Sequence, residues 1–297
     1  MITFFKTALV PSLQERAKVW DTRKMVKVQS FENVQKGWNR HRWDLQHFKV
    51  GKMVKGGIEK GADVIFHTFK YWTLWTGITM EIRGFDENLA NLEGPAIVIC
   101  NHQASGSSQV ISKISDKQYM SALDVVAMTR VWPPRCTVMM KKSLQYIPFF
   151  NLASFLANAI FIDRFNHEKA MSQIDSCVEK LKSKNLKIWI FPEGTRNHGD
   201  GLLKFKKGAF NIAVRGGFPI VPIVLSNYRP FYSKTEKYFK SDGEVIAKVL
   251  SPISTKGLSM EDVPELVEKV RNQMLEVLTD ISQEAAERMK RKRQAAA

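Results

Sequence analysis

The chain has 297 residues, of which 44% are hydrophobic and 25% charged, so it can bury a large core and is neither a disordered tract nor a bundle of membrane spans. Lysine and arginine outnumber aspartate and glutamate by 45 to 29, and the formal charge of +16 favours partners rich in phosphate or carboxylate. Three cysteines without close metal-type spacing argue against a disulfide framework and a zinc site, and indicate a reducing compartment.

Residues 1–70 are expected to form a basic helical segment with aromatic anchors. Residues 1–60 carry 13 lysines or arginines against five acidic residues, interleaved with Trp20, Trp38 and Trp43. This pattern is typical of the surface of an anionic membrane, and it is equally that of a solvated helix packed on the main domain. The start of the chain does not resemble a cleaved signal peptide.

A second apolar stretch lies inside the chain. Residues 143–162 run for twenty positions without a charge, which is the length of a membrane span. Because Gln145, Pro148, Asn151 and Asn158 interrupt the run, we favour a buried or membrane-grazing helix followed by a core strand over 159–163.

Residues 71–297 are predicted to form an α/β domain. Near-continuous apolar strands alternate with amphipathic helices, which is typical of a mostly parallel central sheet flanked by helices. The strands are expected near 78–84, 95–101, 159–163, 186–191, 219–227 and 243–250, and the helices near 171–184 and 209–217. A long final helix is expected from about Ser259, where "SMED" offers a capping box.

Polar residues follow three of these strands. His102 follows "AIVIC" with Asn101 between them, Arg164 follows "AIFID", and "FPEGTR" follows "IWI". Ligands of open α/β sheets bind at the carboxyl ends of strands, where a histidine can act as a base and an arginine can grip phosphate. Glu193 cannot bind phosphate directly, so it would either orient Arg196 or accept a substrate hydroxyl. Lys204, Lys206 and Lys207 add positive charge, which we interpret as a solvated face.

Together these residues resemble a known family. The segments "NHQ…SALD", "FIDR", "FPEGTR" and "VPIV" follow the order and rough spacing of the four motifs of the 1-acylglycerol-3-phosphate acyltransferases, of the animal type. The resemblance covers about residues 71–281.

The resemblance implies a membrane-associated enzyme of phospholipid synthesis. It would transfer an acyl group from acyl-CoA to the free sn-2 hydroxyl of 1-acylglycerol-3-phosphate (lysophosphatidic acid), giving phosphatidic acid. His102 would be the general base and Asp124 would orient it. Arg164 and residues 193–196, that is Glu193, Gly194, Thr195 and Arg196, would bind the acceptor. No metal or cofactor is expected, and the family implies the endoplasmic reticulum membrane, with the site facing the cytosol.

One departure from the family pattern concerns catalysis. The family's first motif is NHxxxxD, whereas residues 103–123 separate His102 from Asp124 here. Deleting 104–120 restores "NHQSALDVV", so we interpret those seventeen residues as an insertion. If the insertion loops outward the pair still meets, and if it displaces the helix expected to start near Ser121 the chain is a weak or inactive lipid-phosphate-binding form.

Two further readings stay open at this point. Net charge and "KRKR" at 290–293 allow nucleic-acid binding, but no aromatic stacking platform or recognition-helix pattern accompanies them. Cys100 lies two residues before His102, which allows a covalent route, although a cysteine inside an apolar strand is usually part of the core.

Overall fold

The computed structural model describes residues 77–103, 116–141, 159–162, 170–195, 197, 201–233, 236, 238–240 and 242–295. At 116–122, 140, 141, 162 and 170 only the backbone is described. The basic segment predicted at 1–70, both arginines of the expected phosphate site (Arg164 and Arg196) and most of the postulated insertion lie outside these ranges.

A seven-stranded sheet forms the centre of the described part, in the order β1-β9-β6-β2-β5-β3-β4. Neighbouring strands run parallel except β6 and β9, which pair antiparallel. The fold class predicted from the alternating pattern is therefore confirmed. The strand bounds are β1 Thr79–Arg83, β2 Ile97–Cys100, β3 Cys136–Lys141, β4 Ile160–Ile162, β5 Lys187–Ile190, β6 Ile220–Leu225 and β9 Glu244–Val249. A separate two-stranded ribbon pairs β7 Tyr232–Ser233 with β8 Tyr238–Phe239.

Both faces of the sheet are covered, which explains why the central strands are almost wholly apolar. All residues of β2, β5 and β6 are buried. Successive side chains of β2 belong to two different clusters: Ile97 and Ile99 to one, Val98 and Cys100 to the other. This alternation is the two-residue period of a strand between two apolar layers.

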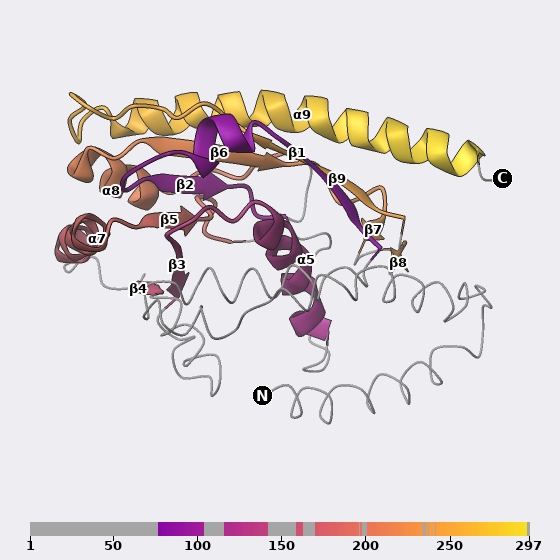
Figure 1. Cartoon of the computed structure of the whole chain (residues 1–297), viewed down its shortest axis with the longest axis horizontal. Helices are drawn as coiled ribbons and strands as arrows, with labels where there is room; N and C mark the ends of the chain where they lie inside the picture. The colour runs from indigo at the N-terminus through magenta and orange to yellow at the C-terminus, as the bar shows by residue number, and fades with distance from the viewer. Residues whose placement is uncertain are drawn as a thin grey trace. The chain divides into compact units, whose positions relative to one another are not determined.

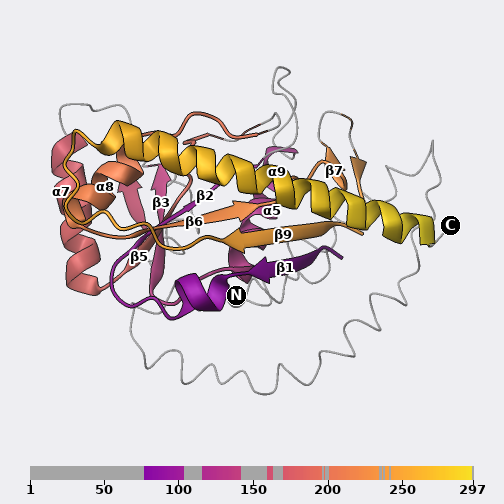
Figure 2. The same ribbon diagram turned by 90° about the horizontal axis from the view of Figure 1, so that it is seen from above.

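In the described part of the chain, four α-helices make up these layers. The bounds are α5 Asp116–Arg130, α7 Ala170–Lys184, α8 Gly208–Gly216 and α9 Val263–Ala295. Helices α7, α8 and α9 cover the face that carries Ile97, whereas α5 packs on the opposite face (Figures 1 and 2). A short π-helix, η4 Asp86–Ala90, follows β1.

The final helix begins four residues later than predicted. Asp262 turns its carboxylate back onto Ser259, accepting from its backbone N–H at 2.7 Å and from its hydroxyl at 2.8 Å. Residues 259–262 therefore form a turn, and the helix starts at Val263. Its apolar stripe is buried as predicted, from Val263 to Ile281, with Val277 only partly buried.

The apolar stretch at 143–162 is described only at its end. There β4 confirms the predicted strand, while residues 142–158 lie outside the described part. Within the ranges given above, no helix has both the length and the apolar character needed to cross a membrane.

Candidate active site

His102 stands at the carboxyl end of β2, beside the end of the neighbouring strand β5. Its imidazole stacks on Phe191, the first residue after β5, with ring centroids 4.3 Å apart and an angle of 23° between the planes. The side chain is 18% exposed, so part of it remains accessible to a ligand. The parallel pairing of β2 with β5 brings these two residues together.

Asp124 meets His102 although twenty-one residues separate them in the chain. Nδ1 of His102 and Oδ2 of Asp124 lie 2.6 Å apart, and the Asp124 side chain is 3% exposed. An ionised carboxylate only accepts hydrogen bonds, so this contact places a proton on Nδ1 and leaves Nε2 free to act as a base.

Helix α5 makes this contact possible. It runs over the face of the sheet that carries Cys100, and it delivers Asp124 to the end of β2 from its third turn. The helix begins at Asp116, so the last five residues of the postulated insertion, 116–120, are helical. The helix was expected to start near Ser121, and it instead extends one turn further toward the amino terminus.

Two side chains beside His102 tie its loop to the end of β6. Asn101 donates to the carbonyl of Leu225 at 3.0 Å and accepts from its N–H at 2.8 Å. Gln103 also donates to the Leu225 carbonyl, and it accepts from the backbone N–H of Tyr228 at 3.2 Å. His102 is therefore held between two amide side chains that bond to the same backbone segment, which fixes the path of its backbone.

Glu193 holds the same loop from the other side. Its Oε1 accepts from the backbone N–H of His102 at 2.8 Å, and its Oε2 accepts from that of Leu203 at 2.9 Å. The residue is 2% exposed. Burial raises the pKa of Glu193, while the two amide hydrogen bonds pull it the other way. Each carboxylate oxygen is already engaged by the backbone, so Glu193 acts as a clip between the histidine loop and the loop after β5.

The turn that follows Glu193 is open to solvent, and the side chain of Lys206 lies across it. Gly194 adopts φ +68°, and a Cβ there would lie 2.7 Å from Cε and 3.0 Å from Nζ of Lys206. The left-handed backbone favours a glycine at this position, and the side chain of Lys206 fills the space that a Cβ would take. Thr195 is exposed beside it. Lys206 is anchored by its backbone N–H, which donates to the Pro192 carbonyl at 2.8 Å.

The thiol of Cys100 is not suited to nucleophilic attack. It is fully buried, and burial together with the nearby charges of Asp124 and Glu193 raises its pKa well above the ordinary value. Because the thiolate is the reactive form, Cys100 is a core residue of β2. Within the described part of the chain, no three His, Cys, Asp or Glu side chains are grouped as metal ligands.

Lys206 and Tyr228 are among the site residues that were not expected from the sequence. Lys206 had a signal in the basic segment "LLKFKKGAF", which we had interpreted as a solvated face. Tyr228, whose hydroxyl contacts Asp124, had none, because an aromatic residue after a strand has the same pattern as any core residue.

Known proteins are similar to this chain in sequence and in fold. A family model described as Acyltransferase matches residues 82–226, which include His102, Asp124 and Glu193. A Caenorhabditis elegans protein, named as a candidate 1-acyl-sn-glycerol-3-phosphate acyltransferase (acl-2), is 49% identical over 77% of this chain and 74% of its own length. The chain belongs to the 1-acyl-sn-glycerol-3-phosphate acyltransferase family. The predicted family is thus confirmed.

Other members of this acyltransferase family are more distant. The mouse 1-acyl-sn-glycerol-3-phosphate acyltransferase alpha is 39% identical over 69% of this chain and 66% of its own length. The crystal structure of the Thermotoga maritima 1-acyl-sn-glycerophosphate acyltransferase PlsC is 24% identical, with a TM-score of 0.53 over 83% of this chain and 89% of that one. This second likeness supports the fold of the acyltransferase. The insertion at 104–120 stays a prediction.

Proposed function

We propose that this acyltransferase transfers the acyl group of acyl-CoA to the free sn-2 hydroxyl of 1-acylglycerol-3-phosphate, giving phosphatidic acid and CoA. His102 is the general base and Asp124 its orienting carboxylate. The observation that carries the assignment is the 2.6 Å contact between Nδ1 and Oδ2 at the strand edge where open α/β sheets place their ligands.

The geometry supports a direct transfer without a covalent enzyme intermediate. Nε2 of His102 takes the proton from the acceptor hydroxyl as its oxygen attacks the thioester carbonyl. The resulting imidazolium is stabilised by Asp124. When the tetrahedral intermediate collapses, the carbon–sulfur bond breaks and the CoA thiolate takes the proton back from His102. The histidine is therefore regenerated in each turnover.

The acceptor phosphate would lie over the turn after β5. Arg164 and Arg196, which the family resemblance assigns to it, lie outside the described residues. Gly194 and Thr195 supply an exposed turn there, and Lys206 extends across it. A flexible ammonium beside an open glycine turn is suited to a phosphate that enters and leaves in every cycle.

The second candidate is a catalytically weak lipid-binding form, disabled by the insertion. The helical start at Asp116 and the intact contact between His102 and Asp124 favour the enzyme, because a displaced helix would separate the pair.

Acyl transfer assays on three proteins test the proposal. We expect the full chain to form phosphatidic acid, and His102→Ala to lose at least about a thousandfold in kcat. Activity that appears only when residues 104–120 are deleted would establish the disabled form. A His102→Ala protein as active as the full chain would refute the role of His102.

A cellular location is proposed alongside the activity. The enzyme would act at the endoplasmic reticulum membrane with its site facing the cytosol, and its charge of +16 would favour an anionic surface and anionic substrates. Sedimentation with phosphatidylserine vesicles is expected to exceed that with phosphatidylcholine vesicles and to fall with added salt. Equal sedimentation with both would contradict this.

A further inference from the structure

His102 and Asp124 together are called the dyad. Tyr228 lies directly behind it, on the side away from the solvent. It follows β6 by three residues and is 2% exposed. Its hydroxyl donates to Oδ1 of Asp124 at 3.2 Å, while the other carboxylate oxygen faces His102. The two oxygens of Asp124 therefore have different partners, one the imidazole and the other a phenol.

The position of this hydroxyl is fixed by the backbone as well as by packing. The N–H of Tyr228 donates to Gln103, the residue after His102. Its carbonyl accepts from the N–H groups of Phe231 and Tyr232 at 3.1 and 2.8 Å. Tyr228 is thus joined to the dyad through Asp124 and, independently, through the loop that carries His102.

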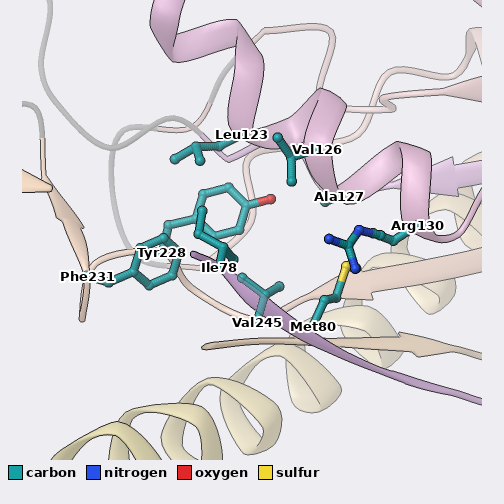
Figure 3. Close-up of a pocket in the computed structure, with 9 residues that line it drawn as sticks. All are labelled: Ile78, Met80, Leu123, Val126, Ala127, Arg130, Tyr228, Phe231 and Val245. Carbon is teal, nitrogen blue, oxygen red and sulfur yellow. The ribbon is translucent and has the colours of Figure 1, made fainter. Parts of the chain in front are cut away.

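Apart from Arg130, the residues that line the pocket beside the ring are apolar. The ring borders this small pocket, in which its hydroxyl points toward Val126 and Ala127 of α5 (Figure 3). The lining residues are Ile78, Met80, Leu123, Val126, Ala127, Arg130, Tyr228, Phe231 and Val245. Burial, reinforced by the charge of Asp124, raises the pKa of Tyr228 well above its ordinary value. The phenol therefore stays protonated and donates to the carboxylate, in a contact that at 3.2 Å is longer than a strong hydroxyl–carboxylate hydrogen bond.

We infer that Tyr228 is a positioning residue for the reaction, which holds the Asp124 carboxylate in the rotation that directs Oδ2 at His102 and stabilises its negative charge. This inference rests on the proposed function of the dyad. Tyr228 does not touch the substrate, so it acts on the rate of the chemical step through Asp124 and leaves substrate binding unchanged.

The decrease of kcat/KM toward acid pH is the measurement that tests the role of Tyr228 most directly. Without the hydroxyl, the charge of Asp124 is less stabilised, so the carboxylate holds a proton up to a higher pH. This change moves the acid limb of kcat/KM upward. Other titratable groups close to the pair are Glu193 and Cys100, with Arg130 in the same pocket, and the substitution leaves all three in place.

Tyr228→Phe in the full chain is the test, with Tyr238→Phe as its matched control. The control removes a hydroxyl that donates to the Arg229 carbonyl near the protein surface. For Tyr228→Phe we expect kcat to fall about tenfold, both KM values to stay within about twofold, and the acid limb to rise by about half a pH unit or more. In an Asp124→Asn background, Tyr228→Phe should cost much less, because the two residues act as one unit.

An unchanged acid limb and a kcat within twofold of Tyr238→Phe would show that Tyr228 is only a core residue. If Tyr228→Phe does not fold, 3-fluorotyrosine at 228 decides instead. Its more acidic hydroxyl should move the acid limb downward, and no movement would overturn the inference. The same variants separate this inference from the proposed function. If His102→Ala remains active, the proposed function of the dyad is wrong. If His102→Ala is inactive and Tyr228→Phe behaves as the wild type, only the role of Tyr228 is refuted.

Discussion

At the scale of single residues, the site is held by buried polar groups that bond to one another and to the backbone. Glu193 fixes the backbone of His102, Asp124 fixes its ring, and Tyr228 fixes Asp124. Catalysis is sensitive to errors of about 1 Å in the position of a base, so residues of this kind can matter as much as the base itself. The sequence could predict His102 and Asp124 from their pattern, but not Tyr228, whose role depends on a contact across 104 positions.

The Glu193→Gln variant tests whether Glu193 stabilises the backbone of the site or binds the substrate. Both carboxylate oxygens accept backbone N–H bonds, so a glutamine would face one N–H with its own NH₂. We expect a loss of about 1–3 kcal/mol in the free energy of unfolding, together with a lower kcat. A higher KM for the acceptor at unchanged stability would instead indicate that Glu193 binds substrate. Denaturant titration and steady-state kinetics on the same preparation distinguish the two.

Lys206→Ala is expected to weaken acceptor binding selectively. Removing the ammonium above Gly194 should raise the KM for 1-acylglycerol-3-phosphate about five- to tenfold, because a charged hydrogen bond to phosphate is lost. The KM for acyl-CoA should change little. Lys256→Ala makes the same charge change near Ile253, at the opposite end of the sheet, and is the control. Equal effects of the two substitutions would mean that only net charge matters.

At the scale of elements, helices α5 and α9 differ in how far the sequence predicts them. The early start of α5 was not predictable, because residues 104–120 lie outside the family pattern and their composition carries no strong helical stripe. Helix α9 was predictable from its apolar stripe, whereas its polar contacts with the edge strand β1 were not. Arg83 of β1 makes two hydrogen bonds to Glu284 of α9, at 2.7 and 2.8 Å.

The pairing of Arg83 with Glu284 predicts that the free energy of unfolding falls in acid. The hydrogen bonds from Arg83 lower the pKa of Glu284 to about 2, below its ordinary value of 4.5. A carboxylate with a lowered folded-state pKa stabilises the fold above pH 4.5, and it loses that contribution as the pH falls toward 2. Glu284→Gln should therefore melt at a lower temperature than the wild type at pH 7, and the difference should shrink between pH 4.5 and 2.

Glu268→Gln, at an exposed position of the same helix, is the comparison for thermal melts over this range. A difference between wild type and Glu284→Gln that stays constant with pH would contradict the role of the pair with Arg83.

At the scale of the whole molecule, much of the architecture could be read from local patterns. Buried strands with two apolar faces predicted the parallel sheet, and the polar residues after them predicted where its site would lie. His102 and Glu193 meet because β2 and β5 are neighbours, which follows from strand order and not from any local signal. The sequence could not predict whether His102 and Asp124 come into contact, because that depends on the path of the chain between Gln103 and α5.

The most direct test of the account is the rate of phosphatidic acid formation by the full chain and its Asp124→Asn variant. Asparagine keeps the shape of the side chain but cannot stabilise the imidazolium, so we expect kcat to fall about a thousandfold or more, while the melting temperature changes little. Asp175→Asn, in the exposed ion pair with Arg215, should keep full activity. An Asp124→Asn protein within about threefold of the wild type would contradict the claim that residues 22 positions apart form one working dyad.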